Sequence, residues 1–192
     1  MHIVRTFAAT LLLAFAELPT VAADDLPRLS FNAMAIGAAS RTDLAIGMIE
    51  ARVQLSRHVL ITAAPTIFYA EGTGTEHQFR TAATLLMQFG PVRLDDRNLW
   101  VFSDAGTTRY RNRLRLTAPL TVSGRELRFQ LLDEMFYEQG GRGWFRNMPG
   151  AGVGIDVGRS LSVDAYWMLL DDDHRPRASM FLLVLTMPLG SC

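Results

Sequence analysis

Four arginines stand at every second position between residues 109 and 115: Arg109, Arg111, Arg113 and Arg115. Side chains alternate between the two faces of a β-strand, so this spacing predicts four guanidinium groups on one strand face. On a helix the same arginines would spread over more than half of the circumference. Clustered guanidinium groups bind carboxylate and phosphate bidentately, and they also pair with neighbouring acids. The segment therefore suits either anion binding or an ion-pair lattice.

Other segments carry charged residues on a polar face that alternates with an apolar face. Glu126, Glu134 and Glu138 follow on the next segment, where they can pair with the arginines across strands. We favour a salt-bridge lattice over an anion path through a lumen, and both interpretations stay open. The remaining residues assigned to this lumen face are Arg80, Arg97, Arg128, Arg146, Asp156 and Asp164.

The elements that position these residues are strands. After residue 23 the chain divides into about ten segments of the length that spans an outer membrane when tilted. We therefore expect an all-β fold, an antiparallel up-and-down transmembrane β-barrel. The expected strands are 29–38, 43–55, 59–70, 76–89, 92–103, 108–120, 126–138, 145–157, 161–170 and 177–187.

Connection lengths and aromatic residues support the same fold. Short connections alternate with longer ones (71–75, 104–107, 139–144 and 171–176), as periplasmic turns alternate with external loops. Asp133 falls on an apolar face, which predicts a bulge or register change. Six aromatic residues flank the longer loops on the apolar face, as an interfacial girdle does. They are Tyr69, Phe79, Phe102, Tyr110, Tyr137 and Phe145.

The N-terminus has the form of a secretory signal. Arg5 precedes a short apolar run, and a small-residue cleavage site ends at Ala23, so we expect a signal peptide over 1–23 and one barrel domain over 24–192. The only cysteine is Cys192, which excludes an internal disulfide and a thiolate metal cluster. Acidic and basic residues balance at 19 each, with no lysine, so no basic field indicates nucleic acid.

Three segments resemble a known bacterial family. Residues 96–99 (DRNL), 108–116 (TRYRNRLRL) and 133–137 (DEMFY) are similar to the family called domain of unknown function 2490, most strongly between about 92 and 170. The resemblance implies an exported outer-membrane β-barrel and no settled activity. The chain departs from the family at its end, Leu185 to Cys192, where an aromatic-terminated strand is usual. Asn147 stands where a basic residue is expected.

The sequence thus predicts a non-enzymatic outer-membrane protein, either a narrow pore or a structural envelope component. Expected partners are outer-membrane lipid, small anions and the barrel-assembly machinery, without a cofactor or metal. One alternative is a soluble periplasmic barrel that carries an apolar ligand. Another is a lipid-modifying enzyme that uses His77 with Ser103, although no motif links them. Asp171 to His174 is interpreted as a solvated acidic loop rather than a cation site.

Overall fold

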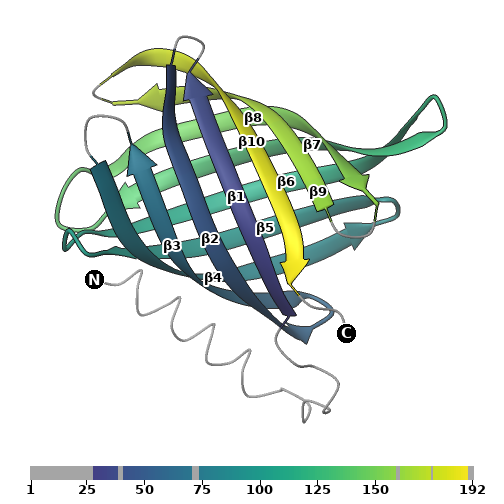
Figure 1. The fold of residues 1–192 in the computed structure, drawn as a ribbon, viewed down its shortest axis with the longest axis horizontal. Coiled ribbons are helices and arrows are strands. Elements are labelled where there is room, and N and C mark those ends of the chain that lie inside the picture. The colour runs from purple at the N-terminus through teal and green to yellow at the C-terminus, as the bar shows by residue number, and fades with distance from the viewer. Residues whose placement is uncertain (1–27, 39–40, 71–73, 159–160, 174, 190–192) are drawn as a thin grey trace.

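The computed structural model describes residues 28–38, 41–70, 74–158, 161–173 and 175–189, which form a single closed β-barrel (Figure 1). The expected signal peptide, His174 and Cys192 lie outside these residues. No helix in the described ranges is long and apolar enough to cross a membrane. The strands are β1 (Arg28–Ala38), β2 (Arg41–Ser56), β3 (Val59–Ala70), β4 (Gly74–Phe89), β5 (Val92–Ser103), β6 (Thr108–Val122), β7 (Arg125–Glu138), β8 (Gly143–Val157), β9 (Leu161–Asp172) and β10 (Arg175–Leu189).

Every strand pairs antiparallel with its neighbour in sequence, and β1 pairs with β10 to close the sheet. Leu29 lies opposite Leu189, so the chain enters and leaves the barrel at the same end. We call this end the terminal end, and the end with the connections 104–107 and 139–142 the loop end. The predicted all-β, up-and-down barrel is confirmed, and each predicted segment lies within one strand.

The connections differ less in length than the sequence indicated. The β9–β10 connection was expected to span 171–176, but β9 runs to Asp172 and β10 begins at Arg175. At the terminal end, Ser123 and Gly124 have φ angles of 51° and 76° and join β6 to β7 directly. Two left-handed residues are the geometry of a tight hairpin turn. Alternating loop length was therefore a weaker guide to this fold than strand length.

The β6–β7 hairpin extends beyond its neighbours at the terminal end (Figure 1). The last β6 residue paired with β5 is Thr117, and the first β7 residue paired with β8 is Arg128. The chain between them pairs only with itself. Glu126 lies on this projecting hairpin and is exposed. Its assignment to the lumen was wrong, because the barrel wall does not reach that far.

A β-bulge in β8 reverses one predicted aromatic residue. Phe136 pairs with Arg146 while Tyr137 pairs with Trp144, so Phe145 is the extra residue. Phe145 is only 3% exposed and packs inside the barrel, while Trp144 is 56% exposed. A bulge shifts the alternation by one residue, which is why parity placed Phe145 on the wrong face. Phe79, Tyr69 and Phe102 are outside as expected, and Tyr110 and Tyr137 join Trp144 in ring contacts on the same face.

The outward face is apolar on every strand whose side chains are described. Large exposed apolar residues occur from β2 to β10, and they alternate with inward polar residues. On β10 the outward set is Phe181, Leu183, Leu185 and Met187. A soluble domain seldom exposes so much contiguous apolar surface, so this face requires an apolar environment.

One polar cluster interrupts the outward face on β5 and β6. Asn112 donates to Asp96 at 2.7 Å and to Asn98 at 3.3 Å, and Tyr110 donates its hydroxyl to Asn98. These mutual bonds satisfy much of the polarity locally. Asp133 also lies on this face, opposite Leu114 and Pro149, in unbroken register with both neighbours. The bulge expected at Asp133 is absent there and lies beside Phe136 and Tyr137 instead.

Candidate functional site

The four alternating arginines of β6 point into the barrel and meet acids on both neighbouring strands. At the loop end Arg109 lies 3.6 Å from Glu138 and 3.8 Å from Glu76. The three deeper arginines contact two further carboxylates, one on β5 and one on β7. A lattice of ion pairs therefore lines this wall, as the alternation predicted.

Glu134 on β7 contacts two of these arginines. Arg111 donates to one carboxylate oxygen, and Arg113 lies 3.9 Å from the other. Glu134 is buried, so both pairs lie where solvent screens them little. A carboxylate with two oxygens can accept from two guanidinium groups at once.

Asp95 repeats this arrangement on β5. Arg93, on the same strand, lies 2.8 Å from one oxygen, and Arg115 lies 2.7 Å from the other. The Asp95 side chain is only 2% exposed. The lumen residues predicted from the sequence do not include Asp95 or Arg93, although both alternate with Arg97 on segment 92–103 and therefore share its strand face.

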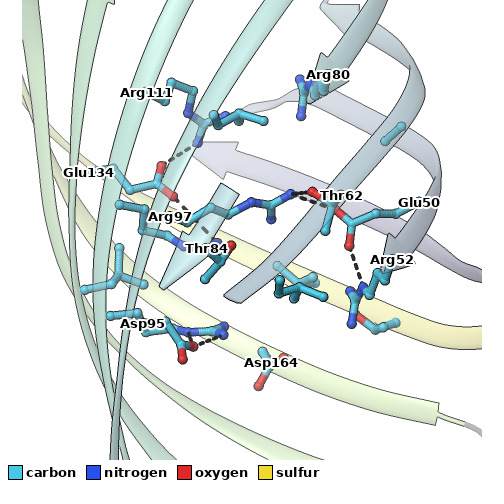
Figure 2. Close-up of a pocket in the computed structure, with 18 of the residues that line it drawn as sticks. Glu50, Arg52, Thr62, Arg80, Thr84, Asp95, Arg97, Arg111, Glu134 and Asp164 are labelled. Carbon is cyan, nitrogen blue, oxygen red and sulfur yellow. Dashed lines mark hydrogen bonds and ion pairs between the residues drawn. The ribbon is translucent and has the colours of Figure 1, made fainter. Parts of the chain in front are cut away.

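Glu50 forms the third case and links strands that are not neighbours. It lies 2.6 Å from Arg52 on its own strand, β2, and 2.7 Å from Arg97 on β5. Arg97 also donates to Thr62 on β3 at 3.1 Å, so its side chain reaches past β4 across the lumen (Figure 2). Glu50, Asp95 and Glu134 thus each contact two arginines. We call each of these carboxylates, together with its two arginines, a bridged pair.

On the adjoining wall, formed by β7 to β9, acidic side chains surround one arginine. Arg128 on β7 lies 2.5 Å from Asp156 and 3.3 Å from Asp164. Gln130 donates to Asp164 at 2.6 Å and accepts from the Tyr166 hydroxyl at 2.6 Å. Here the predicted lumen residues meet as expected, and the glycines of β8 leave room for them.

Towards the loop end, the interior between β7 and β10 is apolar. Phe136 and Phe145 pack there with Met148, Met168 and Leu182. Arg146 lies over both rings and contacts Asp172 at 2.8 Å. A guanidinium on an aromatic face keeps favourable contacts even where water is scarce. The interior therefore changes from a polar region to a more apolar one between β7 and β10 towards the loop end.

A cavity of about 310 Å³ occupies the polar region (Figure 2). Its lining includes residues near the terminal end, such as Gln54 and Thr186, but not Phe136 or Phe145. Four acids line it: Glu50, Asp95, Glu134 and Asp164. Seven arginines line it: Arg52, Arg80, Arg93, Arg97, Arg111, Arg113 and Arg115. The lining thus has a formal excess of three positive charges.

The residues named for the enzymatic alternative make other contacts. The His77 backbone bonds to the Asp104 side chain and backbone. The Ser103 hydroxyl accepts from the Ala105 backbone at 3.1 Å. Within the described ranges, no hydrogen bond joins the His77 ring to Ser103.

Comparison with known proteins gives similarity of fold only. No family model and no curated protein matches the chain. Among solved structures, it is similar to a bacterial polysaccharide outer membrane secretin, with a TM-score of 0.47, 10% identity, and coverage of 77% of this chain and 57% of that one. It is also similar to the de novo designed TMB2.3, with a TM-score of 0.41, 11% identity, and coverage of 88% and 100%.

A third similar structure is OccK5 (OpdH) of Pseudomonas aeruginosa, with a TM-score of 0.33, 9% identity, and coverage of 82% of this chain and 63% of that one. The chain thus spans about three fifths of the length of the secretin and of OccK5. At such identities none of the three indicates which residues of this chain form a site. The chain is therefore identified by its architecture, a closed antiparallel barrel with an apolar exterior and an arginine-lined interior.

Proposed function

We propose that this chain spans the bacterial outer membrane and that its lumen is a narrow passage favouring small anions. The observation that carries the membrane location is the largely apolar exterior of a closed barrel, with large exposed apolar side chains on every strand from β2 to β10. Only helices and closed barrels satisfy all backbone groups in lipid. The arrangement, with apolar residues outside and charged residues inside, is that of outer-membrane barrels.

The positive lining supports the preference for anions. Seven arginines face four acids around the cavity, and each bridged pair keeps one surplus positive charge. Charged groups that line a confined pore select ions of opposite sign. The bridging side chains also narrow the interior, so a wide channel does not fit this lumen.

A bilayer measurement tests this proposal. We expect small channels whose reversal potential in a potassium chloride gradient indicates anion preference, and the preference should fall when Arg111 and Arg113 are both changed to glutamine. Heat-modifiable gel mobility should first establish that each variant is a folded barrel. Arg125→Gln, on the exposed hairpin, is the matched control and should retain the preference. Cation-selective channels would contradict the proposed passage.

A structural envelope role is the second candidate. The cross-lumen contact between Arg97 and Glu50 and the apolar cluster around Phe145 favour it, because both fill the interior. Complete absence of conductance from a folded, inserted barrel would support this role. Recovery in the soluble periplasmic fraction would instead support the apolar-ligand carrier. Loss of a lipid modification in His77→Ala would support an enzyme.

A further inference from the structure

Arg80 on β4 differs from the other arginines of the cavity. It is only 6% exposed, yet no carboxylate lies within ion-pair distance of it in the described part of the chain. Its guanidinium donates from Nε and Nη2 to the same atom, Gln78 Oε1, at 3.0 and 2.6 Å. Three of its five N–H groups therefore meet no protein acceptor among the described residues.

The surroundings of Arg80 are also positive. The charges of Arg97 and Arg111 act on it, opposed by Glu76 and Glu134. Glu134 is already shared by Arg111 and Arg113. Figure 2 shows Arg80 and Arg111 at the same end of the cavity, with Arg111 turned towards Glu134. This region therefore holds more guanidinium groups than the Glu134 carboxylate can neutralise.

Two neighbouring arginines have further unsatisfied donors. The Nε atoms of Arg97 and Arg113 are buried and have no hydrogen-bond partner in the described ranges. A buried donor without an acceptor destabilises the folded protein, because the group has lost its hydrogen bonds to water and gained none in return. A ligand that supplies several negatively charged oxygens would remove these penalties together.

We propose that the cavity binds one small oxyanion, a carboxylate or phosphate group, against Arg80, with Arg97, Arg111 and Arg113 lining the same cavity. The ligand enters from the terminal end, because the lining continues to Gln54 and Thr186 on that side. A volume of about 310 Å³ suits a small solute, since ligand sites usually range from about 300 to 1,000 Å³. The inference rests on the proposed anion-favouring lumen and names its ligand class.

Calorimetric titration of the full chain, folded in detergent micelles at low salt, tests the site with two separate probes, inorganic phosphate and succinate. Low salt is used because dissolved ions weaken the attraction between the anion and the exposed charges of the site at higher ionic strength. We expect saturable binding of at least one probe, with one anion per barrel. Arg80→Gln should weaken that binding at least tenfold. This variant removes no partner from any carboxylate, so the lattice stays paired.

Two further variants make the outcome specific. Arg80→Lys retains the charge without the forked donors and should bind with intermediate affinity, while Arg125→Gln should bind as the unchanged chain does. Unsaturable heats with both probes, or equal affinity after Arg80→Gln, would overturn the site. A barrel that conducts anions without this binding overturns the site alone. A barrel that binds phosphate but never inserts into bilayers overturns the membrane proposal and retains the site.

Discussion

Changing Glu134 to glutamine should lower the free energy of unfolding by about 3 kcal/mol, because it breaks a buried ion pair from one side. Glutamine has nearly the same shape but no charge. Arg111 and Arg113 would then lie in the lumen without the carboxylate they share. Urea unfolding in lipid vesicles, followed by tryptophan fluorescence, measures the loss.

Glu126→Gln is the matched control for this change. Glu126 is on the same strand but exposed on the projecting hairpin, and it has no ion pair among the described residues. Surface substitutions of this kind usually alter stability by less than about 0.5 kcal/mol. Equal losses for the two variants would mean that the bridged pair at Glu134 does not stabilise the barrel.

Changing Gly152 to alanine should destabilise the barrel by about 1–3 kcal/mol through overpacking. A Cβ atom there would overlap the Tyr166 ring and lie 2.6 Å from the Ala165 carbonyl oxygen. That oxygen belongs to the β8–β9 pairing, so it cannot move without disturbing the strands. Tyr166 is also fixed by its hydrogen bond to Gln130. The same unfolding experiment measures the effect.

Gly47→Ala provides the comparison, since a Cβ atom at Gly47 meets nothing within 4 Å. Gly47 lies within β2, where alanine adds no backbone strain, so stability should stay unchanged or rise slightly. If Gly152→Ala were as stable as Gly47→Ala, the close approach of β8 and β9 described here would be incorrect.

The strands and their faces could be predicted because alternation with a period of two is a local property of the sequence. Arg109, Arg111, Arg113 and Arg115 point inward as that alternation requires. An error of one residue would place every side chain of a strand on the opposite face, so the pattern determines orientation strongly. Ten expected segments became ten strands for the same reason.

The features that escaped prediction depend on contacts between distant parts of the chain. The inward position of Phe145 follows from a bulge that only the pairing with Phe136 and Tyr137 reveals. Glu126 was misplaced because hairpin length relative to the neighbouring strands is set by register. The contact between Glu50 and Arg97 requires the curvature of the closed barrel, which brings β2 and β5 face to face across the lumen.

The outward polar cluster is an exception to the alternation of inward polar and outward apolar residues. Asp96, Asn98 and Asn112 occupy positions that alternation assigns to the apolar face. Their mutual hydrogen bonds reduce the cost of placing polar groups there. Alternation places Asn112 on the apolar face of its own strand, but only the pairing of β5 with β6 shows that Asp96 and Asn98 share that face.

Tryptophan quenching tests the central claim, that lipid surrounds this barrel. Trp167 lies in the middle of β9, points outward and is 51% exposed. In a folded variant with Trp100 and Trp144 changed to phenylalanine, lipids brominated on their acyl chains should strongly quench the remaining Trp167. Aqueous acrylamide should quench it weakly. Strong quenching by acrylamide with none by the brominated lipids would contradict the membrane barrel.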